Sequence, residues 1–248
     1  MWSARIFDLR LLAALLLWIP LAGIAYPGKM TKAELALLPA YCPDTMGFAG
    51  YGDAANNTSP RAGHWLSLMG NGFWHMHHYC GAQVAIMRAE KHSTGAQARK
   101  ALLESAVDDI DYAIRNGTKD SGPKFVMLPE IYLKRAQTLA RLRQYDEAVA
   151  SFGDSIAAKP DYWPAYAALA DMYKNLGSPE KALEVVEQGL KFAPSSKLLN
   201  TMLAELQKSG VKRSPKKPEP SGDKDTANAP EPAPKPDATQ AQNPPRAN

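Results

Sequence analysis

Apolar residues recur at helical spacing through the central part of the chain. Leu103, Val107, Ile110 and Ile114, for example, lie four, three and four residues apart. This spacing places them on one face of an α-helix. Similar helix-compatible segments lie on both sides of this one, separated by breaks rich in glycine and proline. We therefore expect an all-α fold that is built from pairs of helices.

An internal repeat is the clearest pattern in the sequence. Residues 129–162 align with residues 163–196, and a shortened third copy begins near Lys197. Each full copy predicts a helix, a turn and a second helix, and a proline ends the second helix. In the first copy the two helices are expected at 131–142 and 146–158. The aligned pairs are Tyr132 with Tyr166, Ala136 with Ala170, Leu139 with Tyr173, Ala148 with Ala182, and Pro160 with Pro194.

These positions resemble the tetratricopeptide repeat family, which has a 34-residue period with small, aromatic and proline residues at set offsets. The resemblance covers residues 129–209 and departs from the family pattern at Arg135 and Val186. It implies a short α-solenoid of stacked antiparallel helical hairpins. The matching residues are Ala136, Ala148, Phe152 and Pro160 in the first copy, and Leu169, Ala170, Tyr173, Ala182 and Pro194 in the second.

A less regular hairpin precedes the two repeats. Its helices are expected at 73–91 and 97–116, and Asn116-Gly117 is a plausible end for the second. Gly81 and Ala106 are expected to take the small-residue positions, although this hairpin is longer than either regular copy. The helical domain at 73–210 would then comprise this divergent hairpin (73–117), the repeats 129–162 and 163–196, and a capping helix at 197–209. Such a stack supplies the three hairpins that stability usually requires.

The two ends of the chain have a different composition. Residues 1–25 place Arg5 and Arg10 before an apolar stretch and end in small residues, which is typical of a cleavable signal peptide. A retained membrane anchor is the alternative. Residues 26–72 are expected to be irregular. The segment 211–248 contains nine of the 20 prolines and no Leu, Ile, Met or aromatic residue, so we expect a disordered tail.

The charge of the folded part argues against nucleic-acid binding. The whole chain has 29 basic and 25 acidic residues, but residues 26–210 contain 20 basic and 19 acidic residues. Nucleic-acid-binding domains usually concentrate Lys and Arg on one face. The leader predicts export to the periplasm or cell envelope, with no membrane span left after its cleavage.

The two cysteines, Cys42 and Cys80, are expected to form one disulfide, because an exported protein meets an oxidising compartment. A catalytic thiol or a metal thiolate remains an alternative, although there is no Cys-x-x-Cys motif. The acidic cluster Asp108, Asp109 and Asp111 is expected to be a solvated helix face, since it lacks the spacing of a calcium loop.

A histidine cluster is the main candidate for metal chemistry. His75 and His78 are spaced to share a helix face, whereas His77 is expected to point nearly the opposite way, towards Cys80. The first two could bind copper or zinc with a third ligand from His64, Asp53 or Met46. Packing of the first hairpin against the segment around Cys42 is the simpler explanation.

The family resemblance implies a concave groove lined by the first helix of each hairpin, which binds a peptide or helix of another protein. Leu133 and Ala167 would form a small apolar floor, and Lys134, Arg141 and Lys174 could pair with acidic side chains. We expect a non-catalytic adaptor without a cofactor; a metal or redox-linked protein is the alternative. The groove residues so implied are Glu130, Leu133, Lys134, Gln137, Ala140 and Arg141 in the first copy, and Pro164, Ala167, Ala168, Asp171, Lys174 and Asn175 in the second.

Overall fold

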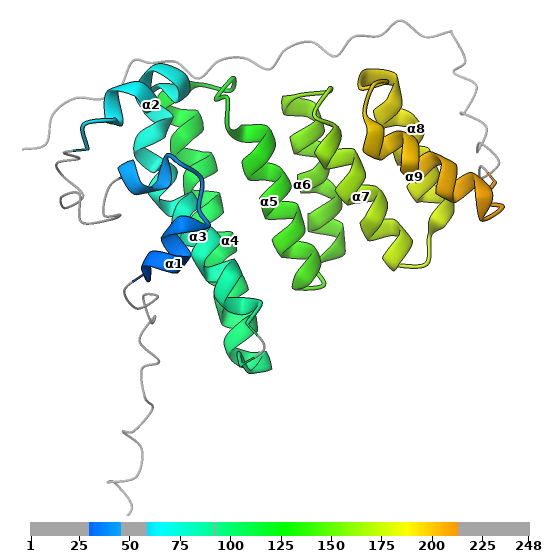
Figure 1. The fold of residues 1–248 in the computed structure, drawn as a ribbon, viewed down its shortest axis with the longest axis horizontal. Coiled ribbons are helices and arrows are strands. Elements are labelled where there is room, and N and C mark those ends of the chain that lie inside the picture. The colour runs from blue at the N-terminus through cyan, green and yellow to red at the C-terminus, as the bar shows by residue number, and fades with distance from the viewer. Residues whose placement is uncertain (1–29, 46–58, 92, 213–248) are drawn as a thin grey trace, which may run out of the picture. The chain divides into compact units, whose positions relative to one another are not determined.

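Antiparallel helix pairs stacked side by side make up most of the structure (Figure 1). This computed structural model describes residues 30–45, 59–91 and 93–212, which belong to one unit and contain helices and no strand. The expected all-α class is therefore confirmed. The predicted leader at 1–25 and all but the first two residues of the predicted tail at 211–248 lie outside the described residues.

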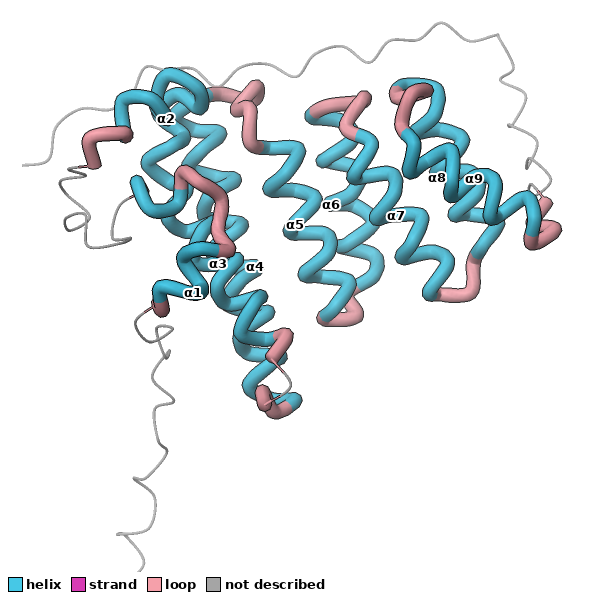
Figure 2. The backbone as a smooth tube through the Cα atoms, viewed as in Figure 1, coloured by secondary structure: helices cyan, strands magenta, loops and turns pink. Residues whose placement is uncertain are grey.

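The two regular hairpins and the last helix lie close to their expected positions. Short loops connect them (Figure 2). Each second helix ends two residues before the proline of its copy, and Ser196 caps the last helix by accepting a hydrogen bond from the backbone of Leu199. The helices are α5 (Leu128–Arg141), α6 (Tyr145–Ala158), α7 (Trp163–Asn175), α8 (Pro179–Phe192) and α9 (Lys197–Lys208).

The first hairpin consists of α3 (Met76–Ala89) and α4 (Ala96–Ser121). Ala82 of α3 and Ala106 of α4 are fully buried, as are the aligned alanines of the two regular copies. Ala82, rather than the expected Gly81, therefore takes the small-residue position, because Gly81 is only half-buried and a Cβ on it would have room beside Asp109. The two small residues are twice as far apart in sequence here as in each regular copy, so the hairpin carries an insertion.

The end of α4 differs from the prediction. The helix continues past Asn116 to Ser121 and stops at Gly122, whose φ of 78° is suited to glycine. Gly117 is not a cap. It lies inside the helix, where the ring of Phe125 packs against it. A Cβ at residue 117 would be 2.6 Å from the Phe125 Cε1 atom, so the close packing requires glycine.

Replacing Gly117 with alanine is expected to destabilise the protein by about 1 to 3 kcal/mol, because the added methyl overpacks the site of Phe125. The matched control is Gly153→Ala in α6, where no atom lies within 4 Å of the added Cβ. That change should stabilise the protein by about 1 kcal/mol through helix propensity. Urea unfolding of both variants tests the pair, and two effects of the same sign would contradict the packing role of Gly117.

The described parts of residues 26–72 contain helices that were not predicted. They include α1 (Lys32–Ala36), the 3-10 helix η1 (Cys42–Asp44), α2 (Ala62–Met69) and the start of the 3-10 helix η2 (Gly70–His75). The capping box of Thr31 and Glu34 starts α1, a short local signal. These elements pack on the first hairpin, whose core they share through Tyr41, Cys42 and Met69.

Candidate protein-binding face

Helices α5 and α7 carry the residues expected to face a partner. The polar members of this set are at least partly accessible, and we call the surface that they form the candidate binding face. Leu133 and Ala167 are different, since they are only 8% and 5% exposed and belong to the cores between neighbouring helices. They do not form the expected apolar floor, because adjacent first helices pack against each other at these positions. The face comprises Glu130, Lys134, Gln137, Arg141, Asp171, Lys174 and Asn175.

Ion pairs link the candidate binding face to the helices on either side. Arg141 of α5 lies 2.5 Å from the carboxylate of Glu90, at the end of α3. Lys174 of α7 lies 3.8 Å from Asp171 and 3.8 Å from Glu205 of α9. These pairs join α5 to the end of α3 and α7 to α9, and α5 and α7 are themselves in contact. They are exposed pairs, so each contributes little to stability.

Lys134 is the cation of this face that has no ion pair with a described residue. Burial, followed by the positive charge of Arg141, lowers the pKa of its ammonium group, and the carboxylates of Glu130 and Glu90 act in the opposite direction. Keeping a lysine charged in a partly buried place costs free energy, and the carboxylate of a bound partner would offset that cost. This makes Lys134 the point of the face that is most receptive to an acidic group.

Glu130 lies at the other end of α5 and contacts the first hairpin. Its Oε1 atom accepts a hydrogen bond of 3.1 Å from the hydroxyl of Tyr79 in α3, which is fully buried. Burial and the carboxylate of Glu130 raise the pKa of Tyr79. This contact cannot be predicted from the repeat pattern, because an insertion within the first hairpin sets the register of α3 against α5.

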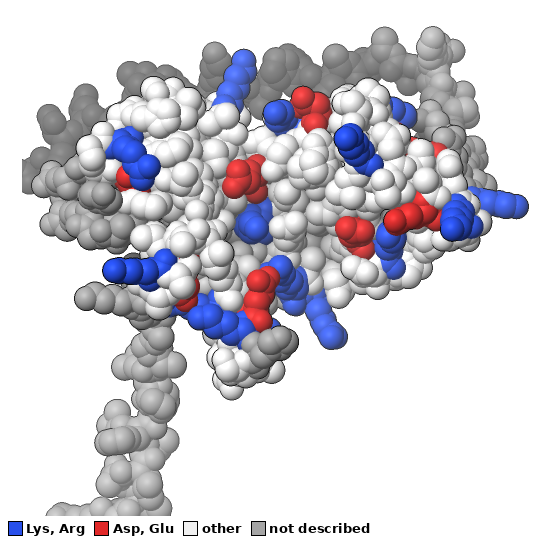
Figure 3. Space-filling view, viewed as in Figure 1, with Lys and Arg blue, Asp and Glu red and all other residues white. Residues whose placement is uncertain are grey.

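Charges of both signs are interspersed on the face of the molecule seen in Figure 3. This distribution agrees with the near balance of basic and acidic residues in the folded part. This view does not show a surface dominated by Lys and Arg, which nucleic-acid-binding proteins usually present.

Comparison with known proteins identifies the stacked hairpins. Residues 139–206 match the family model described as tetratricopeptide repeat. The chain contains tetratricopeptide repeats. It is also similar to the Hsp70-Hsp90 organizing protein of Triticum aestivum, with 30% identity over 95 residues, which are 38% of this chain. The match spans only 16% of that protein. Tetratricopeptide repeats generally mediate protein–protein interaction and are typically not catalytic.

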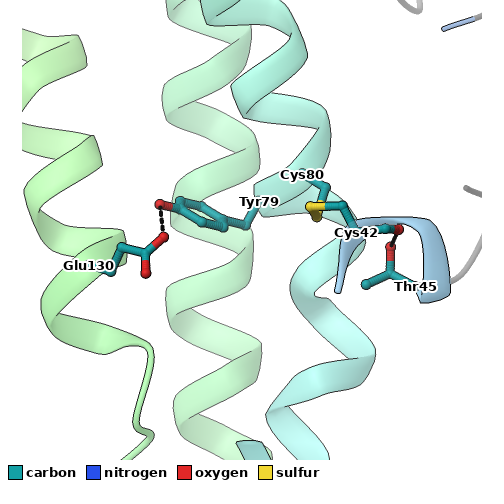
Figure 4. Close-up of a disulfide and its surroundings, with 5 residues drawn as sticks. All are labelled: Cys42, Thr45, Tyr79, Cys80 and Glu130. Carbon is teal, nitrogen blue, oxygen red and sulfur yellow. Dashed lines mark hydrogen bonds between the residues drawn. A yellow bond between two sulfur atoms is a disulfide. The ribbon is translucent and has the colours of Figure 1, made fainter. Parts of the chain in front are cut away.

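A disulfide joins the segment before the tetratricopeptide repeats to the first hairpin. Cys42 of η1 is bonded to Cys80 of α3, and neither cysteine is exposed (Figure 4). The same close-up shows Tyr79, the residue before Cys80, reaching from α3 to Glu130. The expected pairing of the cysteines is therefore present in the structure, and the alternatives of a free catalytic thiol or a metal thiolate do not fit it.

Two buried carboxylates hold the same N-terminal segment in place. Glu34 of α1 accepts hydrogen bonds of 2.9 and 3.0 Å from the guanidinium group of Arg88. Asp44 is fully buried and accepts hydrogen bonds from Ser59, Arg61 and Trp65. The hydrogen bond from Arg88 holds the pKa of Glu34 far below its usual range. Neither carboxylate is among the predicted functional residues, although the capping-box pattern marks Glu34.

The histidine cluster differs from the expected arrangement. His75 and His78 both lie beside Tyr112, but each is bonded to its own carboxylate, Asp120 at 2.7 Å and Asp109 at 2.6 Å. His77 does not point away from them. Its Nδ1 atom donates to the carbonyl oxygen of Trp74, and its ring lies 4.4 Å from that of His78.

The donor sets for the expected metal site are not brought together. His64 lies on α2 and contacts Trp65, whereas Asp53 and Met46 are outside the described residues. Within the ranges that the structure describes, no three His, Cys, Asp or Glu side chains are placed to hold a metal ion. The acidic cluster is also not a purely solvated face, because Asp109 bonds His78 and Asp111 bonds Arg135 at 2.6 Å.

His77 is expected to make the protein less stable in mild acid. Burial and the neighbouring His78 lower the pKa of His77 from 6.5 to about 4. The unfolded chain therefore takes up a proton that the folded chain resists, so the free energy of unfolding falls as the pH drops from 6.5 towards about 4.

Urea unfolding at about pH 7 and about pH 5 measures this effect. The variant His77→Gln should lose less stability between the two conditions than the unchanged protein does. The matched control is His64→Gln, which replaces an exposed histidine on α2 and should leave the pH dependence as it was. Equal pH dependence in His77→Gln and the unchanged protein would contradict the assignment.

No helix among the described residues is both long and apolar enough to cross a membrane.

Proposed function

We propose that the tetratricopeptide repeats bind a segment of another protein along the candidate binding face, and that the protein is a non-catalytic adaptor in the cell envelope. The general role of such repeats in protein–protein interaction supports the first part. The observation that carries it on this chain is the ammonium group of Lys134 on α5, which is partly buried and has no ion pair with any residue that the structure describes.

The charges around Lys134 favour an acidic group on the partner. Arg141 and Lys174 already have carboxylate partners within the chain, so they contribute to the field of the face without offering a free site. A partner carboxylate at Lys134 would form a charge-assisted hydrogen bond in a partly desolvated place, where such bonds are stronger than on an open surface. The bound segment would thus present at least one Asp or Glu side chain to α5.

The location in the envelope is supported by two features. The first residues have the pattern of a signal peptide. The cysteines are also joined in a fully buried disulfide, and such bonds persist mainly in oxidising compartments. Fractionation of cells that produce the full chain tests the location, and recovery with the cytosolic markers would contradict it.

Site-specific photo-crosslinking tests the binding role. A photoreactive amino acid at Gln137 of α5 or at Asp171 of α7, which hold the same repeat position, is expected to give a product with a specific protein in cells. The same amino acid at Arg115, which is exposed on α4 in the outer layer, serves as the matched control. Products from Arg115 in equal yield, or none from Gln137 and Asp171, would contradict the proposed function.

Charge reversal refines the test. With the partner in hand, Lys134→Glu should weaken binding at least tenfold, since it removes an attraction and adds a repulsion of like charges. Arg115→Glu should change the affinity little. Isothermal titration at two salt concentrations measures both, and an unchanged affinity of Lys134→Glu would show that the partner brings no acidic group to this site.

A further inference from the structure

We propose that residues 39–45 act as an intramolecular ligand of the surface that the first helices of the hairpins, α3, α5 and α7, form together. They cover the share of this surface that belongs to α3, so a partner is held by α5, α7 and α9 alone. That a partner is held by the other helices rests on the proposed function, whereas the covering of α3 by residues 39–45 does not.

Equivalent positions in α3 and α5 follow from the buried small residues. Ala82, Ala136 and Ala170 are all fully buried at the crossing of the two helices of their hairpins. A second contact agrees with this register. His78, four residues before Ala82, bonds Asp109 of α4, and Tyr132, four residues before Ala136, bonds Ser151 of α6 through its carbonyl oxygen.

This register assigns residues of α3 to the candidate binding face. Cys80 is then equivalent to Lys134, Gln83 to Gln137 and Met87 to Arg141. In α5 these positions are at least partly accessible. In α3, Cys80 is fully buried, whereas Gln83 and Met87 are partly accessible, although the Nε2 atom of Gln83 is itself shielded from solvent.

The N-terminal segment is what covers these positions. Cys42 is bonded to Cys80, and the side chain of Tyr41 lies beside Gln83. Burial and the carboxylate of Glu130 raise the pKa of Tyr41, and its hydroxyl is shielded from solvent. Two residues of the segment, 41 and 42, thus occupy the two central positions of α3.

Polar contacts hold residues 39–45 at their end and through α1, which precedes them in the sequence. On one side Glu34 pairs with Arg88 and with Lys91, both of which follow Met87 in the sequence. On the other side Asp44 bonds Ser59, Arg61 and Trp65. Apolar contact in the middle with charge-assisted bonds at the ends is the pattern of a peptide on a receptor.

The test uses the full chain, cut once between the segment and the hairpin. A protease-recognition sequence is inserted between Gly50 and Tyr51, and the N-terminus is labelled with fluorescein. In the cut, oxidised protein the disulfide retains the N-terminal fragment. After reduction with a phosphine, we expect the fragment to remain bound at high concentration and to dissociate on dilution with a measurable Kd, while the helical circular dichroism of the remainder persists.

Arg88→Ala should raise that Kd at least tenfold, because it removes two charge-assisted hydrogen bonds to Glu34. Arg115→Ala is the matched control and should leave the Kd unchanged. Loss of the helical signal as the fragment dissociates would overturn the proposal, since the hairpins would then be unable to fold without the segment. Immediate loss of the fragment on reduction, or no effect of Arg88→Ala, would overturn it as well.

These outcomes do not depend on any partner, so they are separate from failure of the proposed function. A separate experiment tests whether the partner is kept away from α3. A photoreactive amino acid at Gln83 in the intact protein should give no partner product under conditions in which Gln137 and Asp171 do. A product from Gln83 would show that the partner reaches α3 and would overturn the covering role, whereas the proposed function would stand.

Discussion

Removing the disulfide is expected to destabilise the folded protein by about 4 kcal/mol. Cys42 and Cys80 are 38 residues apart, so the bond closes a loop of substantial length in the unfolded chain. Both cysteines are fully buried, so side chains that replace them would not be in contact with water in the folded protein. In the chain-entropy model the bond acts mainly by restricting the unfolded ensemble.

Urea unfolding of the double variant Cys42→Ser and Cys80→Ser, compared with the unchanged protein, measures this effect. Addition of a phosphine to the unchanged protein should reduce its stability towards that of the variant and should leave the variant itself unaffected. Identical unfolding midpoints for the two proteins without reductant would refute a stabilising role.

Replacement of Phe125 with alanine should cost about 4 kcal/mol, the range for a large buried aromatic residue. The residue is 3% exposed, and its ring packs between two glycines that have no room for a side chain. A Cβ on Gly72 or on Gly117 would each lie 2.6 Å from an atom of this ring. Phe125 therefore fastens the loop between α4 and α5 to η2 and α4, and alanine would leave a cavity that the two backbones cannot close.

The adjacent residue provides the control. Val126 is 60% exposed, and Val126→Ala should change the free energy of unfolding by less than about 0.5 kcal/mol. Thermal and urea unfolding of both variants would show whether the ring carries the effect. A loss for Phe125→Ala as small as that for Val126→Ala would mean that the loop contributes nothing to the core.

The repeat period made the stacked hairpins predictable from sequence. A fixed period leaves little freedom, because Ala136 and Ala170 must each meet the small residue of the second helix at the same offset, Ala148 and Ala182. In the first hairpin the equivalent residues are twice as far apart. An insertion breaks the alignment, so the pattern favours Gly81 over Ala82 and predicts a helix end at Gly117, where the helix instead packs against Phe125.

The family resemblance names residues for the candidate binding face, but it does not predict how their charges pair. The family positions predict Lys134, Arg141 and Lys174 alike as cations that could pair with acidic side chains of a partner. Which of them keeps a free charge depends on Glu90, at the end of α3, and on Glu205 of α9, both of which are distant in sequence from the cations that they pair. Such pairings depend on the register between helices, which periodicity alone does not encode.

The histidine cluster shows the same limit. The spacing of His75 and His78 suggested a metal site, whereas their partners Asp120 and Asp109 come from a separate helix. A helical period places two side chains on one face, but it does not say which groups the neighbouring helix brings opposite them.

The last helix sets the length of the stack. One side of α9, with Leu199, Met202 and Leu206, is buried against α8 and its neighbours, and the other side is exposed and mostly polar. A further hairpin would have to bury the exposed polar side chains of Asn200, Thr201 and Glu205, which costs free energy unless it supplies hydrogen-bond partners. Growth of the array is therefore unfavourable at this end, and a designer who wished to add a repeat would first have to rewrite the outer side of α9.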